Sequence, residues 1–162
     1  MRNFLVITIL CCFVGLVDAA DNPIKRMEGY YQIPAHSCFS LEGGEYVSCE
    51  DRMTDCLSIK AIDGKTAQIS VDSWQTNGHE CSVSGVAKLQ GNSLVYVGGD
   101  DDLDSKGKKF SIDLIDGKLK FRYLNPSNIE MRSPFCGFRA SLELLEFDMK
   151  VRAPVGPSCP RE

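Results

Sequence analysis

The sequence predicts an all-β protein: a single antiparallel meander that closes into a small barrel or sandwich and is stabilised by disulfides. Three observations support this prediction. From Cys56 onward, apolar and polar residues alternate with a period of two. Asp-Gly and Gly-Asn pairs interrupt the alternation where hairpin turns are expected. An N-terminal export signal precedes an even number of cysteines, which predicts disulfides. The sequence contains no convincing long amphipathic helix to compete with this prediction.

The N-terminus reads as a secretory signal peptide over residues 1–19. Arg2 supplies the positive charge, residues 4–17 form the apolar segment, and small residues at 17 and 19 favour cleavage after Ala19. The apolar run is shorter than the roughly 20 residues that span a bilayer. We therefore expect no membrane anchor. Residues 20–162 are expected to form one domain of a periplasmic or secreted monomer.

The cysteines of the mature chain are predicted to be disulfide staples, because an exported protein folds in an oxidising compartment. Of eight cysteines, Cys11 and Cys12 lie in the signal, which leaves six: Cys38, Cys49, Cys56, Cys81, Cys136 and Cys159. Six cysteines allow about fifteen pairings, and their spacing leaves all of these open. C-x-x-C pairs are absent and only two histidines occur. No metal site and no cofactor are therefore expected.

Hairpins account for most of the predicted strands. Each pairs two alternating segments through a glycine-containing turn. Asp63-Gly64 favours the positive φ angles of a type I′ turn, and Gly91-Asn92 and Asp116-Gly117 interrupt the other two hairpins. The paired segments are residues 57–62 and 67–71, residues 81–86 and 94–96, and residues 110–114 and 119–123.

The chain outside these hairpins has weaker signals. Residues 29–33 and 45–48 are predicted to be short strands, kept brief by a neighbouring proline and glycines. Residues 138–151 fit either period, and we favour one or two closing strands over a short helix. The proline-rich tail, residues 153–162, cannot continue a strand or helix. We expect Cys159 to tie it back to the domain.

The charge of the chain disfavours nucleic acid as a partner. The net charge is −4, and the two basic clusters, residues 106–109 and 150–152, are short. The acidic run at residues 100–104 faintly resembles a calcium loop. However, Ser105 and Ser111 stand where such a loop needs glycine and glutamate. We interpret the run as an acidic hairpin loop.

No motif of a known catalytic mechanism is present. His36 and His79 lack an adjacent nucleophile motif, and neither G-x-S-x-G nor H-E-x-x-H occurs. The sequence therefore favours a non-enzymatic protein, although carboxylates brought together by the strands leave acid–base chemistry open. Trp74, at the end of a predicted strand, is expected to fill the core, with a ligand platform as the alternative.

One pair of motifs carries a resemblance to known proteins. The run Asn77-Gly-His-Glu-Cys-Ser-Val-Ser-Gly85 and the later run Cys136-Gly-Phe-Arg-Ala140 resemble small exported domains with an H-x-C-x-x-x-G … C-G-x-R-A/G-S pattern. Some of those domains are described as periplasmic lysozyme-inhibitor-like proteins. The resemblance covers residues 56–147 and implies that Cys81 pairs with Cys136. Two further cysteines of those domains are absent here, as are the S-G-x-x-Y and T-K-G motifs of the best-known inhibitor family.

Three functions follow as hypotheses. The favoured one is a binding protein with a protein partner, in its most specific form an inhibitor of a lysozyme-type cell-wall hydrolase. The alternatives are a small-ligand carrier with a lipocalin-like cavity lined by Trp74, Tyr96 or Tyr123, and a secreted enzyme. The candidate contact loops are residues 74–79, 98–107 and 125–135. The candidate contact residues are Trp74, Asn77, His79, Asp100, Asp102, Asp104, Arg132 and Arg139.

Overall fold

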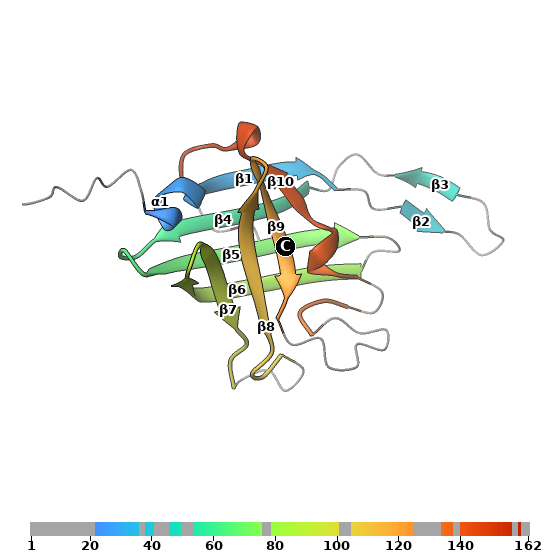
Figure 1. The fold of residues 1–162 in the computed structure, drawn as a ribbon. Helices are drawn as coiled ribbons and strands as arrows, with labels where there is room; N and C mark the ends of the chain where they lie inside the picture. Colours follow the sequence, from blue (N-terminus) through green and yellow to red (C-terminus); the bar gives the residue numbers. More distant parts are fainter. Residues whose placement is uncertain are drawn as a thin grey trace, which may run out of the picture.

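The computed structural model describes residues 22–35, 38–40, 46–49, 54–75, 79–100, 105–124, 134–137, 140–156 and 159. The predicted signal peptide lies outside these residues. Among them, eight antiparallel strands form one sheet in the order β1-β4-β5-β6-β7-β8-β9-β10 (Figure 1). The strands are β1 (Gly29–Pro34), β4 (Thr54–Ala61), β5 (Thr66–Gln75), β6 (His79–Gln90), β7 (Ser93–Val97), β8 (Lys109–Ile115), β9 (Lys118–Tyr123) and β10 (Glu146–Asp148). The fold is therefore the predicted all-β meander.

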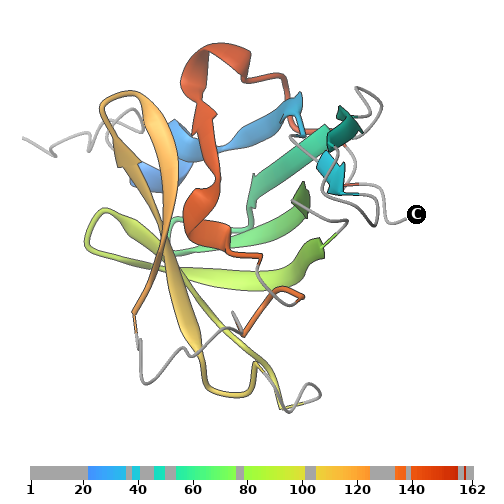
Figure 2. The ribbon, with the colours of Figure 1, turned by 90° about the vertical axis from the view of Figure 1, so that its right-hand side faces the viewer.

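The sheet curls until its last segment meets its first (Figure 2). Just after β10, Ala153 forms an antiparallel bridge with Tyr30 of β1. The Tyr30 N–H donates to the Ala153 carbonyl at 3.0 Å, and the Ala153 N–H donates to the Tyr30 carbonyl at 2.8 Å. This pair nearly closes the sheet into a barrel and covers strand edges that would otherwise be free to pair with other chains.

Strand register sorts the side chains into an inner and an outer face. Tyr31, Leu57 and Val71 are successive partners across β1, β4 and β5. All three are almost completely buried. Along each strand, the residues that alternate with these inner residues point to the outer face, as a period of two requires. The interior is therefore built from the apolar half of the alternation that the sequence displays.

Packed side chains fill the described part of the barrel interior. A large aromatic group lies at its centre, with ring centroids of Phe110 and Phe121 5.7 Å apart and of Phe121 and Phe147 6.4 Å apart. A cavity wide enough for water would leave accessible surface on its lining. Among the described residues, the following inward-facing side chains have an exposed fraction of 0%: Tyr31, Leu57, Ile59, Ile69, Leu94, Phe110, Ile112, Leu119 and Phe147.

A short helix, α1 (Pro23–Met27), covers one end of the barrel, which we call the helix end. The Asn22 side chain caps it by accepting a hydrogen bond from the Ile24 N–H at 2.9 Å, and proline follows at the first helical position, where it is favoured. Ile24 and Met27 are buried in the core. The Tyr31 hydroxyl donates to the Met27 carbonyl at 2.8 Å. The sequence analysis did not predict this helix, although Asn-Pro is an N-terminal helix signal.

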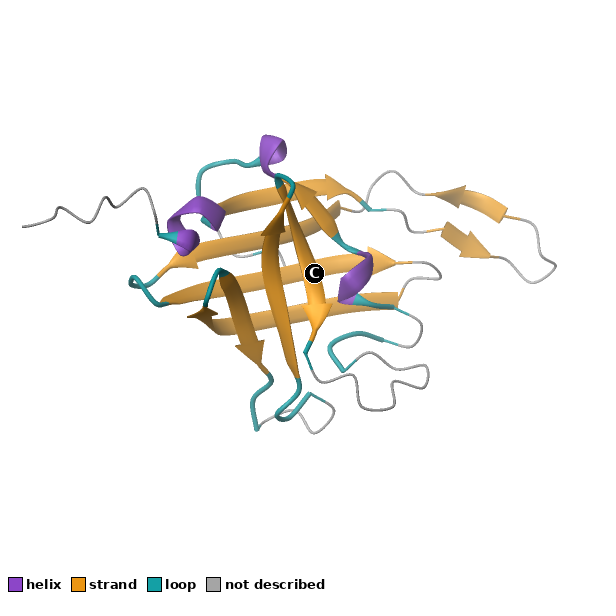
Figure 3. Ribbon diagram, in the orientation of Figure 1, coloured by secondary structure: helices purple, strands orange, loops and turns teal. Residues whose placement is uncertain are grey.

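Two further predictions need correction. The strand expected at residues 45–48 is β3 (Tyr46–Cys49), and it pairs with β2 (Cys38–Ser40) in a separate hairpin rather than in the barrel. Figure 3 shows this hairpin apart from the main sheet. The ambiguous segment at 138–151 contains both predicted structures: the closing strand β10 and the 3-10 turns η3 (Leu142–Leu144) and η4 (Met149–Val151).

The type I′ turn predicted at Asp63-Gly64 is wrong, whereas the Asp116-Gly117 turn is of this type. Asp116 and Gly117 have φ angles of 52° and 75°, as a type I′ turn requires. Gly64 does not adopt a positive φ. The Asp63 carboxylate instead accepts hydrogen bonds from the N–H groups of Lys65 and Thr66, both at 2.7 Å. A side-chain cap thus replaces the expected backbone turn.

Disulfides tie distant parts of the barrel together. Cys56 on β4 bonds Cys159, with the Cα atoms 5.9 Å apart. The proline-rich tail is therefore held against the outer face of the sheet, as predicted. Cys81 on β6 bonds Cys136, with the Cα atoms 4.0 Å apart, which is the pairing that the resemblance implied.

Candidate functional site at the loop end

The meander places its long connections at one end of the barrel, opposite the helix end. We call this the loop end. Because neighbouring strands are antiparallel, the connections between β5 and β6, between β7 and β8, and between β9 and β10 all leave from this end. These are the three loops predicted to contact a partner. The helix end has only short turns after β4, β6 and β8.

The segment between β9 and β10 folds back and closes the loop end from within. We call its described residues, Pro134–Gly137 and Ala140–Leu145, the plug. The plug residue Phe135 is 8% exposed. Its ring lies 5.1 Å from that of Phe110 and 5.9 Å from that of Tyr96, both edge-on, and it stacks on Tyr123 at 6.2 Å. The plug therefore continues the aromatic core to the barrel mouth.

Hydrogen bonds fix the plug to the strands. The Gln75 side chain, on the inner face at the end of β5, donates to the Ser141 carbonyl and accepts from the Ser141 N–H, both at 2.8 Å. The Tyr123 hydroxyl accepts from the Leu142 N–H at 3.2 Å. The Glu143 carboxylate accepts from the Tyr123 N–H at 3.0 Å. These bonds satisfy backbone groups that burial would otherwise leave unpaired.

The two motifs that carry the resemblance meet at this plug. Besides the disulfide, Cys81 and Cys136 form an isolated antiparallel bridge, and the Gly137 N–H donates to the Glu80 carbonyl at 2.8 Å. A Cβ atom on Gly137 would stand 3.7 Å from Nδ1 of His79. The short segment beginning at His79 and the one at Cys136 are therefore neighbours in space.

Several predicted contact residues lie at or near this end. His79 is the first residue of β6 and is half-buried. Asp100 is exposed and forms a 3.0 Å ion pair with Lys106 within the loop between β7 and β8. An ion pair this exposed contributes little to stability. The other five candidates lie outside the described residues: Asn77, Asp102, Asp104, Arg132 and Arg139.

Trp74 does not fill the core, contrary to expectation. Its register partner is Glu80 on the outward-facing row of β5 and β6, and it is half-buried there. Its backbone N–H donates to the buried Asp55 carboxylate at 2.9 Å. The alternation places Trp74 out of phase with the inner residues Val71 and Ser73. A count of the strand from its first core residue would have found this.

The aromatic residues expected to line an open mouth lie within the packing instead. Tyr96 is in ring contact with Phe110 at 5.3 Å. It lies against Gly85, where a Cβ atom would stand 2.7 Å from the Tyr96 ring. Because Gly85 has no side chain, the Tyr96 ring can pack against it beyond the point where the pairing of β6 with β7 ends. Tyr123 is 7% exposed and stacks on Phe135.

Two residues that hold the plug, Gln75 and Ser141, are not among the predicted contact residues. A signal for Gln75 was present: it continues the inward-facing row of β5 as a large polar side chain, where apolar residues precede it. Such a residue needs an internal partner. Nothing in the local sequence identifies Ser141 as that partner.

The chain matches no protein-family model, and neither curated proteins nor solved structures yield a significant match. Within the described residues, no three His, Cys, Asp or Glu side chains are grouped as metal ligands would be. No helix in that same part of the chain is long and apolar enough to cross a membrane.

Proposed function

We propose that this protein is an exported, non-enzymatic binding protein that recognises a protein partner through the loops of its loop end. The carrying observation is the closure of the barrel. The plug covers one end, α1 covers the other, and the described apolar side chains of the core are at most 8% exposed. A partner would therefore bind to the outer surface of the protein and not inside the barrel.

Rigidity of the loop end supports this proposal. The Cys81–Cys136 disulfide and the two Gln75 hydrogen bonds hold the ends of the loops in one arrangement. A preorganised surface loses less conformational entropy on binding than a mobile one. Disulfides also require an oxidising compartment, which supports a periplasmic or secreted location.

The carrier alternative finds less support. A lipocalin-like carrier needs an open cavity, commonly of about 300–1,000 Å³. Tyr96 and Tyr123, two of the residues that would line it, pack against Phe135. Trp74 faces outward.

The specific partner that we propose is a lysozyme-type cell-wall hydrolase, which the protein would inhibit. The resemblance in the two motifs around His79 and Cys136 supports this choice. The chain has a net charge of −4, and residues 100–104 of one loop include four aspartates. Such a surface attracts a basic partner and accelerates its association at low salt.

A direct test uses the oxidised mature protein, starting at Ala20, as bait for c-, g- and i-type lysozymes and for a periplasmic or culture extract. Captured proteins are identified by mass spectrometry, and each captured lysozyme is then assayed for lysis. Capture with loss of lytic activity is the expected result. A variant with D100N, D102N and D104N should weaken capture. The matched control D116N changes an exposed aspartate of the opposite end.

Failure to capture any lysozyme would overturn the inhibitor proposal. Capture of another protein, weakened by the loop variant and not by D116N, would retain the wider proposal of a protein-binding loop end. Equal binding by both variants would contradict a role for the acidic loop.

A further inference from the structure

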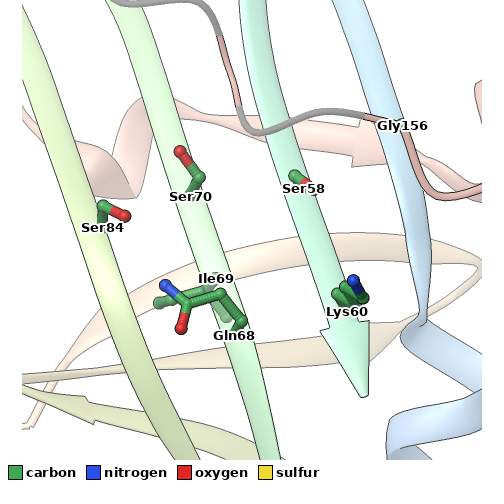
Figure 4. A pocket seen from close by; sticks show the side chains of 7 residues that line it. All are labelled: Ser58, Lys60, Gln68, Ile69, Ser70, Ser84 and Gly156. Atoms are coloured by element: carbon green, nitrogen blue, oxygen red, sulfur yellow. The ribbon is translucent and has the colours of Figure 1, made fainter. Parts of the chain in front are cut away.

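A polar groove lies on the outer face of the barrel, away from the loop end. Ser58, Ser70 and Ser84 are register partners on β4, β5 and β6, and Gly156 of the C-terminal tail borders the same space (Figure 4). Lys60 and Gln68 complete the polar lining. The groove has a volume of about 340 Å³, at the lower end of the range for small-molecule sites.

The C-terminal tail borders this groove at Gly156. It is held at one end by the Ala153 bridge to Tyr30 and at the other by the Cys56–Cys159 disulfide. The Cys159 sulfur also contacts the Ser70 carbonyl at 3.4 Å. A Cβ atom on Gly156 would stand 3.7 Å from the Tyr30 ring, so this ring lies under the tail beside Ser58. The walls of the groove are therefore anchored.

Two largely buried serines, Ser58 and Ser70, contribute hydroxyls to the groove lining. Ser58 and Ser70 are each 6% exposed and line the groove. Neither hydroxyl has a hydrogen-bond partner within the part of the chain that the structure describes. Both hydroxyls are thus available to a molecule that enters the groove.

The charge of the groove is positive. Lys60 is exposed and forms no ion pair with a described residue, and the lining contains no aspartate or glutamate. A serine hydroxyl both donates and accepts hydrogen bonds, and the Gln68 amide offers both functions separately. This combination suits a ligand with several hydroxyls and one negative charge.

We infer that this groove binds a small polyhydroxylated acid, such as an acidic monosaccharide unit, with its hydroxyls on Ser58, Ser70, Ser84 and Gln68 and its carboxylate on Lys60. The lining has no arginine, and the neutral donors outnumber the single cation. A sugar acid therefore fits better than a phosphate, which is usually held by arginine or by backbone N–H groups at a helix N-terminus.

The test measures binding to the oxidised mature protein by NMR titration, with glucuronate, glucose and acetate as probes. Glucuronate should shift the backbone amides of residues 58, 70 and 84, and should bind more tightly than glucose or acetate. Ser70→Ala removes one hydroxyl and should weaken glucuronate several-fold. Lys60→Gln should weaken it about tenfold, as expected for a hydrogen bond to a charged group.

A matched control is Ser82→Ala, because Ser82 is an exposed serine of β6 that is not part of the groove lining. It should leave glucuronate binding unchanged. Ser70→Ala should also fold normally, since its hydroxyl has no partner among the described residues. Folding of each variant is checked by thermal unfolding before titration.

Three results would overturn the inference: no shift with glucuronate, equal binding of acetate, or equal binding of glucose. A further comparison uses a disaccharide that ends in glucuronate. Tighter binding of this disaccharide than of free glucuronate would identify a glycan end as the source of the ligand. Tighter binding of the free acid would identify a soluble metabolite, and both results support the assigned chemistry.

Discussion

The Gln75 side chain hydrogen-bonds both backbone groups of Ser141, a residue 66 positions later in the chain, through two 2.8 Å contacts. This pairing attaches the plug to the end of β5, while the disulfide at Cys136 attaches it to β6. It also positions Leu142, which is 0% exposed, in the core. The Gln75 side chain therefore both holds the plug in place and keeps Leu142 in the core.

Replacement of Gln75 by alanine should destabilise the protein. Both backbone groups of Ser141 would lose their partner, at a cost of about 1–3 kcal/mol for each buried group that water does not reach. The free energy of unfolding is measured by urea denaturation. Gln90→Ala is the matched control, because Gln90 is an exposed glutamine at the end of β6. Equal stability of the two variants would contradict the role of the pairing.

Loss of the Cys81–Cys136 disulfide should loosen the plug selectively. The bridge closes a loop with a sequence separation of 55, and its removal should lower the free energy of unfolding by about 4 kcal/mol in the chain-entropy treatment. Hydrogen exchange of the Ser141 and Leu142 amides should accelerate in the double alanine variant. Loss of the Cys56–Cys159 bridge, with a separation of 103, should destabilise similarly but leave these two amides protected relative to the rest of the core.

A third disulfide is expected between Cys38 and Cys49. These residues are register partners on β2 and β3, and partner positions on antiparallel strands bring Cα atoms within the range of a disulfide. Peptide mapping under non-reducing conditions should recover one linked peptide that contains both residues. Recovery of two free thiols, or of either residue bonded elsewhere, would refute this prediction.

Stability should fall in acid partly through Glu146. Hydrogen bonds from Lys120, and then from Lys118, lower the pKa of this carboxyl from 4.5 to about 2. Its folded-state pKa lies below its unfolded-state value, so its contribution is present above about pH 4.5 and disappears as the pH falls toward 2. The group is exposed, and salt should reduce the effect.

The measurement compares denaturation midpoints of the wild type and E146Q between pH 6 and pH 2 at low salt. The wild type should be the more stable at pH 6, and the difference should vanish toward pH 2. E80Q, which changes another exposed glutamate, is the control. A difference that persists undiminished at the lowest pH would show that charge is not its source.

Alkaline stability should depend on Tyr31. Burial is the main cause that raises the pKa of its hydroxyl from 10 to about 12. Because the folded-state value is the higher one, the associated stability is complete below pH 10 and is lost as the pH rises to about 12. Ultraviolet titration should show one tyrosine that ionises last, and Tyr31→Phe should remove that step. An unchanged titration curve in the variant would assign the late step to another tyrosine.

Some features of the fold could be predicted from neighbouring residues. The alternation in β5 and β8 separates two faces, and Asp116-Gly117 determines a type I′ turn through backbone conformations that few other residues adopt. The proline-rich tail could be expected to leave the sheet and return through Cys159. These features depend on interactions within a few residues or on the small number of available cysteines.

Other features depended on contacts that no local pattern contains. The candidate loops could be identified singly, whereas their location at one end depends on the number and direction of the strands. The alternation of residues 45–48 does not predict that β3 pairs with β2 instead of joining the main sheet.

The sequence by itself determined the fold class, the six cysteines of the expected mature chain and the acidic loop, because periodicity, composition and turn chemistry are local properties of the chain. Only the tertiary structure decided that the plug closes the barrel, that Gln75 binds Ser141, and that Ser58 and Ser70 form a groove beneath the tail. These relationships join residues far apart in sequence. They exist only once the sheet has curled and brought these distant segments together.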